Sequence, residues 1–313
     1  MPIRQIGSLD VSLVGLGCNN FGGRTDERQS TEVVEAALEA GINFFDTADI
    51  YGGTRSEEIL GQALGTERST VVVATKFGLA LDDERKGAAP AYVKRALEDS
   101  LRRLQTDYVD LYQLHRPDPA TPIVDTLAAL AELVHEGKVR EIGCSNFSVE
   151  QLREAEAAVA AGAPRFVSVQ NEYNLLHRQP ELEVLPECER LGIAFLPYFP
   201  LHSGLLSGKY SSAQPPAGTR VAGMPADRQA AVLSAPNLEA VRALSGFARD
   251  HGHTVLELAI AWLAAHGPVA SVIAGATRPE QVWANAAAAE WVLSDVERAE
   301  VDALVPAPGP DGG

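Results

Sequence analysis

Three short apolar runs each end in an ionisable residue. Asp46 ends one run in FFDTADIYG, Lys76 ends VVVATK, His115 ends LYQLH, and Tyr51 follows Asp46 in the next loop. Each alone could be a satisfied polar group at a strand end. A charged group there is unfavourable without a partner, and the carboxyl ends of barrel strands gather on one face. We therefore expect the four side chains to converge.

These residue types together predict proton donation to an oxygen atom. A tyrosine near its ordinary pKa of about 10 is a weak acid at neutral pH, but an adjacent lysine cation stabilises the phenolate and lowers the pKa. Lys76 is expected to do this for Tyr51 and to pair with Asp46. His115 is expected to orient and polarise a carbonyl oxygen. No side chain can supply a hydride, so the hydride must come from a cofactor.

The elements that position these residues follow from the alternation of β-branched runs with amphipathic segments, which is typical of βαβ units. Eight strands, each followed by a helix, predict an α/β fold, a (β/α)8 TIM barrel, with residues 3–13 as a β-hairpin ahead of it. An open doubly wound sheet also fits the pattern. The expected strands cover 14–18, 44–47, 71–75, 109–114, 141–145, 166–170, 194–198 and 270–274.

Helix boundaries are predicted from capping residues and glycines. Ser30 is expected to open the first helix and Gly41 to end it. Two long connections, 77–90 and 199–236, exceed the usual length and are expected to bind a ligand. Other expected helices cover 91–104, 122–137, 148–162, 181–191, 238–249 and 255–265, and a last barrel helix opens at Thr277-Arg278-Pro279.

Composition limits the class of protein. The 313 residues fit one barrel domain, 1–313, with a frayed tail at 306–313. No apolar run of transmembrane length occurs and the start lacks a secretory h-region, so a cytoplasmic protein without a membrane partner is expected. The three cysteines have no metal-type spacing, which predicts neither a disulfide framework nor a metal site. The net charge of −16 argues against nucleic acid as a partner.

The chain resembles the aldo-keto reductases over essentially its whole length. The matching segments, in the family's order, are DTADIYG, TKFG, LYQLH, EIGCSNF, VQNEYN, YFPLHSGLLSGKY and GATRPEQVWAN. The resemblance implies a barrel that binds NADPH or NADP+ in extended form and reduces aldehyde or ketone carbonyls to alcohols. It matches Asp46, Tyr51, Lys76 and His115 to the catalytic tetrad, with Tyr51 as the proton donor.

The cofactor residues carry over from the same resemblance. Ser145, Asn146 and Gln170 match residues that hydrogen-bond the nicotinamide carboxamide, and Tyr198 matches the residue that stacks on the ring. Arg278 would contact the adenosine 2′-phosphate at the helix opened by Thr277, and Asn285 would lie near adenine. The segment along the pyrophosphate would contain Pro200, Leu201, Gly204, Leu206 and Lys209.

The sequence departs from many relatives near the adenosine end of this site. Gly275 and Gln281 stand where many carry basic residues, and Ala284 stands where many carry a glutamate. In this the chain looks more like the branch of bacterial reductases and potassium-channel β subunits. In that branch an arginine of the long loop helps to bind phosphate, and Arg220 is the candidate.

Two other functions compete with carbonyl reduction. One is a Schiff-base lyase with Lys76 as nucleophile; the other is a regulatory protein that holds NADP(H) as a sensor with little turnover. For a reductase, the candidates for the substrate pocket are Asn20, Phe21, Phe77 and Tyr112, which suggest a partly aromatic site for an aldehyde, ketone or sugar-like carbonyl.

Overall fold

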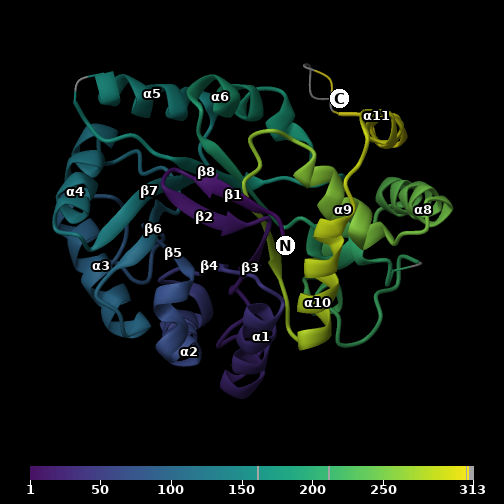
Figure 1. Cartoon of the computed structure of the whole chain (residues 1–313), viewed down its shortest axis with the longest axis horizontal. Coiled ribbons are helices and arrows are strands. Elements are labelled where there is room, and N and C mark those ends of the chain that lie inside the picture. Colours follow the sequence, from purple (N-terminus) through teal and green to yellow (C-terminus); the bar gives the residue numbers. More distant parts are fainter. Residues whose placement is uncertain (161, 211, 308, 310–313) are drawn as a thin grey trace.

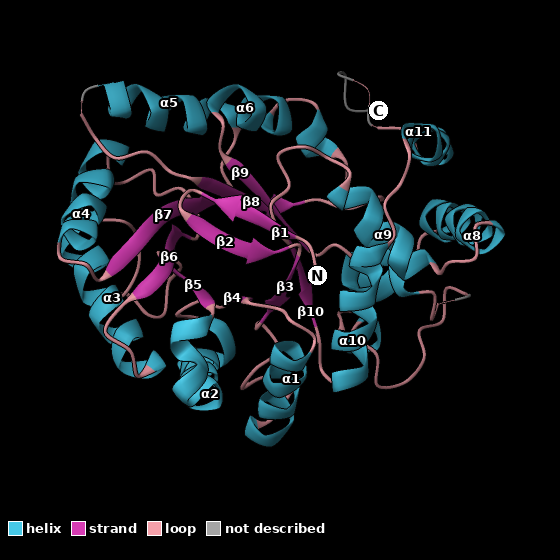
Figure 2. Cartoon of the chain, viewed as in Figure 1, coloured by secondary structure: helices cyan, strands magenta, loops and turns pink. Residues whose placement is uncertain are grey.

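The computed structural model of the chain describes residues 1–160, 162–210, 212–307 and 309. Within these residues, eight parallel strands close into a barrel, and Figure 2 shows helices surrounding it. The predicted (β/α)8 barrel is confirmed, and the open sheet is excluded. The barrel strands are β3 (Val14–Gly17), β4 (Phe44–Asp46), β5 (Val72–Phe77), β6 (Val109–Leu114), β7 (Val139–Ser145), β8 (Ser168–Glu172), β9 (Ala194–Tyr198) and β10 (Val272–Gly275).

The helices form an outer layer that follows the chain around the barrel (Figure 1). Three of them, α2, α7 and α11, lie in segments where the sequence did not lead us to expect a helix, and α7 falls within the long connection 199–236. The helices are α1 (Glu27–Glu39), α2 (Arg55–Leu64), α3 (Pro90–Leu104), α4 (Ile123–His135), α5 (Val149–Ala160), α6 (Val184–Leu191), α7 (Ala226–Val232), α8 (Ala235–Asp250), α9 (Val255–Ala264), α10 (Pro279–Ala287) and α11 (Asp295–Leu304).

The predicted hairpin covers one end of the barrel (Figure 1). It consists of β1 (Ile3–Ile6) and β2 (Leu9–Ser12), which pair antiparallel. Ile6, Leu9 and Val11 are buried in a cluster with residues of the strands' amino ends such as Phe44 and Val72. This apolar plug leaves the carboxyl ends of the strands as the open face of the barrel.

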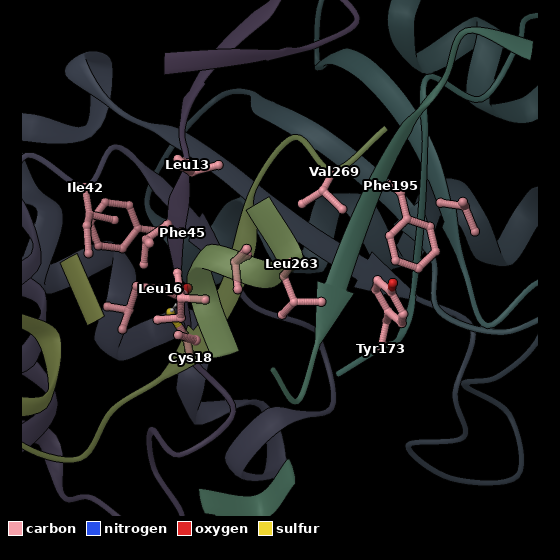
Figure 3. Packing of buried hydrophobic residues seen from close by; sticks show 14 of the residues in the cluster. Leu13, Leu16, Cys18, Ile42, Phe45, Tyr173, Phe195, Leu263 and Val269 are labelled. Carbon is pink, nitrogen blue, oxygen red and sulfur yellow. Dashed lines mark hydrogen bonds between the residues drawn. The ribbon is translucent and has the colours of Figure 1, made fainter. Parts of the chain in front are cut away.

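The larger apolar core fills the space between the sheet and the helices. Figure 3 shows Leu16 and Phe45 close together at the left, Phe195 and Tyr173 packed against each other at the right, and Leu263 between the two pairs. Burying this layer drives the helices onto the strands. The strands are therefore apolar on the face toward the helices, and their inner face is apolar at the hairpin end but polar toward the carboxyl ends, where Asp46 and Lys76 lie.

Two helix starts show which capping signals act. Helix α1 begins at Glu27 rather than after Ser30, because Asp26 is the N-cap and accepts a hydrogen bond from the Gln29 amide at 2.8 Å. Ser30 Oγ instead donates back to the Asp26 carbonyl. Helix α11 has a capping box between Ser294 and Glu297, a signal that could be read from the sequence.

In the predicted frayed tail, residues 308 and 310–313 lie outside the described residues. None of the described helices is both long and apolar enough to cross a membrane.

Candidate active site

The predicted catalytic residues meet at the open face of the barrel. Asp46 ends β4, Lys76 lies in β5, and His115 follows β6. Lys76 Nζ donates to Asp46 Oδ2 at 2.6 Å and to the Thr47 carbonyl at 2.8 Å. The same nitrogen lies 5.1 Å from the centre of the Tyr51 ring, and the Tyr51 and His115 rings meet edge to face at 5.7 Å. The expected convergence is therefore present.

Tyr51 is held by a tight turn that follows β4. The Tyr51 amide donates to the Ala48 carbonyl, and the Asp49 amide donates to the Lys76 carbonyl, which ties the turn to β5. Gly52 has a φ of 58°, and a Cβ at this position would lie 2.3 Å from the Phe21 carbonyl oxygen. Only glycine fits there. The turn thus fixes the position of the phenol relative to Lys76.

The Asp46 carboxylate is surrounded by donors inside the barrel. Besides Lys76, its Oδ1 accepts from Gln170 Nε2 at 2.9 Å and from Gln113 Nε2 at 3.2 Å. Lys76 is fully buried and Asp46 nearly so. A buried charge pair of this kind is tolerated when the remaining lone pairs are hydrogen-bonded, as here. The pair provides a fixed cation beneath Tyr51.

Electrostatics at this pair keep Lys76 charged and Tyr51 neutral. Burial lowers the pKa of Lys76, but the charges of Asp46 and Tyr51 outweigh it, so the pKa lies above its usual value. For Tyr51, burial raises the pKa, while Lys76 acts in the opposite direction. Lys76 lowers the pKa of Tyr51, as expected, but the effect of burial is larger, so the pKa stays above its usual value. Tyr51 therefore carries its proton at neutral pH.

His115 is neutral in this environment. Burial lowers its pKa to about 3, with further contributions from the charges of Lys76 and Arg116. Its Nδ1 has no hydrogen-bond partner within the described chain, and its backbone carbonyl accepts from Asn146 Nδ2 at 3.0 Å. A neutral imidazole can donate one hydrogen bond to a bound oxygen without competing with Tyr51 as an acid.

We expect His115 to stay unprotonated in the folded protein from pH 8 to about pH 4. Its folded pKa lies below the unfolded value of about 6.5, so its contribution to stability is present above pH 6.5 and is lost as the pH falls toward 3. NMR titration of histidine ring signals would measure this, with His115→Gln used to assign the resonance. A midpoint near 6.5 in the native protein would contradict the assignment.

A cavity of about 880 Å³ opens above this cluster. Tyr51 and His115 lie in its wall, and residues from both long connections line it, including Leu79 of 77–90. The predicted cofactor positions that line it are Ser145, Asn146, Gln170, Tyr198, Pro200, Leu201, Gly204, Lys209, Arg220, Gly275, Thr277, Arg278, Gln281 and Asn285. Leu206 is not among the lining residues in the described chain, because its side chain is fully buried in the apolar core.

The predicted nicotinamide residues form one hydrogen-bonded wall. Ser145 Oγ donates to the Gln170 carbonyl at 2.7 Å, and Asn146 Nδ2 donates to Ser145 Oγ at 3.0 Å. Tyr198 donates its hydroxyl proton to Asn146 Oδ1 at 2.8 Å. The Gln170 side-chain nitrogen already serves Asp46. The wall is thus preorganised and connected to the catalytic cluster.

The opposite part of the cavity is cationic. Lys209, Arg220 and Arg278 line it, joined by Arg24 from the loop after β3, a residue that no sequence motif identifies. Burial lowers the pKa of Lys209, and the charges of Arg24 and Arg278 lower it further, which shows that these cations act on one another. Such a group favours an anion.

The amino end of α10 closes this cationic region. Gln281 Oε1 accepts from the Thr277 amide at 2.8 Å and from Thr277 Oγ1 at 3.1 Å. Arg278 is the N-cap residue of this helix and lies at the cavity. Gln281 therefore shapes the turn from which Arg278 extends.

The predicted substrate pocket needs correction for three of its four residues. Asn20 lines the cavity and donates to the Ala276 carbonyl, but Phe21, Phe77 and Tyr112 are fully buried and are not lining residues in the described chain. Phe77 and Tyr112 pack against each other at 4.6 Å, and the Tyr112 hydroxyl donates to the Val93 carbonyl of α3. The physical reason for these two is strand alternation, which turns them toward the helices.

The comparisons with known proteins agree with this fold. The model of the Aldo/keto reductase family matches residues 13–306. The chain is 35% identical to the "Probable aldo-keto reductase 1" of Glycine max, over 95% of this chain and 86% of that protein. It is also 35% identical to the aldo-keto reductase YhdN of Bacillus subtilis, over 95% and 91% of the two chains.

A third relative is named as an ion-channel subunit rather than as a reductase. The "Probable voltage-gated potassium channel subunit beta" of Oryza sativa is 37% identical over 91% of this chain and 90% of that protein. Both kinds of relative are those that the sequence resemblance led us to expect. Family membership supports oxidoreduction with a nicotinamide cofactor. The chain belongs to the aldo/keto reductase family.

Proposed function

We propose that this protein reduces aldehydes and ketones to alcohols with NADPH, and that Tyr51 donates the proton. The observation that carries this proposal is the buried Lys76 and Asp46 pair beneath the Tyr51 phenol, next to a neutral His115, in the wall of one cavity. This arrangement supplies an acid that is protonated at neutral pH and a cation that stabilises its conjugate base.

The chain's own residues bind and protonate the carbonyl oxygen. Tyr51 and a neutral His115 both lie at the cavity, so the oxygen can accept a hydrogen bond from each. When bound, NADPH supplies the hydride to the carbonyl carbon. The Tyr51 proton passes to the oxygen as negative charge develops there, and Lys76 stabilises the phenolate that remains. The net change is one hydride and one proton added across the C=O bond.

The residues that line the cavity are of the types that bind the nicotinamide and phosphate groups of NADPH. One part has the amide and aromatic wall of Ser145, Asn146 and Tyr198, and the other has the cations Lys209, Arg220 and Arg278. In a chain of net charge −16, such a local group of cations favours phosphate groups. We propose that Arg278 and Arg220 contact the 2′-phosphate that distinguishes NADPH from NADH.

Arg278→Ala should weaken NADPH binding by about ten- to a hundred-fold and barely change NADH binding, because a charge-assisted hydrogen bond contributes roughly 1.5 to 3 kcal/mol. Arg220→Ala should act in the same way but more mildly. Titration of tryptophan fluorescence with each nucleotide would measure this, with the surface variant Arg242→Ala as control. Equal losses for both nucleotides would place these arginines at the shared pyrophosphate, and wild-type affinity as high for NADH as for NADPH would contradict the NADPH proposal.

A Schiff-base lyase is disfavoured by the state of Lys76. An amine nucleophile must be unprotonated and reachable, whereas Lys76 is fully buried, ion-paired and raised in pKa. Incubation with a carbonyl compound and borohydride should therefore leave Lys76 without a mass adduct.

A sensor that binds NADP(H) with little turnover is the second candidate. The relatives named as potassium-channel β subunits favour it. Stopped-flow oxidation of bound NADPH by a panel of aldehydes separates the two. Rapid oxidation supports the reductase, and stable NADPH in the presence of every aldehyde supports the sensor.

The acidic net charge of the chain bears on where the protein works and on its partners. We propose one domain that acts on small carbonyl compounds in the cytoplasm, without a nucleic acid or membrane partner. Its support is the acidic net charge of the whole chain and the location of the cations at the cavity.

A further inference from the structure

The arginines that make no polar contact are concentrated at the cavity. Most arginines of the chain donate to a carboxylate or a carbonyl group. Within the described residues, those without a side-chain hydrogen bond or ion pair are Arg24, Arg116, Arg220, Arg228, Arg242 and Arg278. All of these except Arg228 and Arg242 line the cavity. Because the chain has 42 acidic against 26 basic residues, a cation left without an acid is unusual.

Arg116 acts on a different part of the cavity from Arg24 and Arg278, while Arg220 interacts with both Arg24 and Tyr51. The charges of Arg24 and Arg278 act on Lys209, in the region proposed for the phosphates. The charge of Arg116 acts instead on His115, its neighbour in the sequence, and on Tyr198. The positive charge of Arg116 therefore belongs to the catalytic part of the cavity.

The backbone on both sides of Arg116 is fixed. The His115 carbonyl accepts from Asn146 Nδ2, and the His115 amide donates to the Phe77 carbonyl. Pro117 follows directly, and a residue before proline is restricted to extended conformations. The guanidinium can thus move by its side-chain torsions, while its attachment point next to the reacting centre stays in place.

Two acids of nearby segments, Asp118 and Glu172, form no ion pair with Arg116 in the described chain. Asp118 accepts from the Ala88 and Ala120 amides and from the Thr121 hydroxyl. Glu172, at the end of β8, acts on Tyr198 but forms no ion pair with Arg116 in the part of the chain that the structure describes. An anion that enters the cavity beside His115 would therefore meet an uncompensated guanidinium.

We propose that the carbonyl substrate carries a carboxylate or phosphate group near its reacting carbon, and that Arg116 binds this group and determines specificity. This inference rests on the proposed reductase function. Arg116 holds the anion through charge-assisted hydrogen bonds, for which the planar guanidinium is well suited. With the anion there, the carbonyl oxygen is directed toward Tyr51 and His115.

Matched aldehydes test the proposal. Purified full-length protein with NADPH is assayed with 4-carboxybenzaldehyde against 4-formylbenzamide, which differ mainly in charge. Glyceraldehyde 3-phosphate is compared with glyceraldehyde to test for a phosphate group. Together the two pairs of aldehydes show whether a carboxylate or a phosphate is preferred. The variants are Arg116→Ala and Arg116→Lys. Arg242→Ala on α8 removes the same charge away from the cavity and serves as the matched control.

We expect wild-type kcat/KM to favour the anionic member of at least one pair. Arg116→Ala should lower kcat/KM for that member by roughly 10- to 100-fold, mainly through KM, and leave the neutral member within about two-fold. Arg116→Lys should recover part of the loss. Arg242→Ala should change neither. Calorimetric binding of benzoate to the protein with NADP+ should weaken in Arg116→Ala, which gives a readout independent of turnover.

Failure of this inference is distinct from failure of the proposed function. If wild type reduces the neutral and anionic aldehydes equally well, or Arg116→Ala slows both alike, Arg116 does not select anions, and the reductase proposal stands. If wild type binds NADPH but reduces none of the four aldehydes, the reductase proposal fails. Even if the protein reduces none of these aldehydes, unchanged benzoate binding in Arg116→Ala would overturn the proposed anion site.

Discussion

Replacing Tyr51 with phenylalanine should lower kcat for carbonyl reduction by about 100-fold or more, because it removes the proton and almost no volume. The edge-to-face ring contact with His115 does not involve the hydroxyl, and Lys76, which loses its hydrogen bond to that hydroxyl, is still held by Asp46 and the Thr47 carbonyl. The fold and NADPH affinity should therefore stay close to those of wild type. Steady-state kinetics with a simple aldehyde, together with fluorescence titration of NADPH, would measure both.

The control for this variant is the melting temperature, which should barely change. A near-wild-type kcat in Tyr51→Phe would remove Tyr51 from its proposed role, because the variant has no hydroxyl proton to donate. A loss of NADPH affinity equal to the loss of kcat would instead make Tyr51 a cofactor-binding residue.

Lys76→Met should abolish measurable reduction while NADPH still binds. Lys76 lies beneath the cavity wall and touches Asp46 and the Thr47 carbonyl rather than the region proposed for the phosphates. Its removal leaves Asp46 buried with only the two glutamine amides as donors, and removing one partner of a buried pair costs about 3 to 5 kcal/mol. Chemical denaturation should show this loss alongside the kinetic effect.

A double variant separates the chemical role of Lys76 from its structural one. Asp46→Asn with Lys76→Met removes both charges, so much of the lost stability should return while activity stays absent. If the double variant regains reductase activity, the cation is not needed for proton donation. If Lys76→Met fails to bind NADPH but reduces normally at saturating cofactor, its assigned role is wrong.

The sequence allowed the barrel and the catalytic cluster to be predicted because both depend on local patterns. Apolar runs that end in Asp46, Lys76 and His115 indicate strand ends, and barrel closure brings strand ends together. Phe77 shows that closeness in sequence to a site residue does not place a side chain in the pocket. It follows Lys76 directly, yet the alternation of side chains along β5 directs it away from the barrel interior. The same period-two rule separates Tyr112 from Gln113, whose side chain reaches Asp46.

The remaining features depend on tertiary structure that no short motif records. Helix α2 begins after Thr54, which has positive φ and no side-chain cap, so the usual start signal is absent. Arg24 and Arg116 resemble ordinary surface arginines until the fold shows that no acid pairs with them in the described chain. The pKa of Tyr51 is raised because burial outweighs the lowering effect of Lys76. The extent of burial depends on the folded structure, so the sequence alone does not predict this result.

The plug formed by β1 and β2 also bears on how Tyr51 would regain a proton under the proposed function. In the described residues, Ile6, Leu9 and Val11 are buried across one end of the barrel, and Tyr51 lies in the wall of the cavity at the other end. If Tyr51 is the proton donor that we propose, bound product would lie between the phenolate and the solvent at the mouth of this cavity. Product release would then precede reprotonation of Tyr51, which couples the two steps.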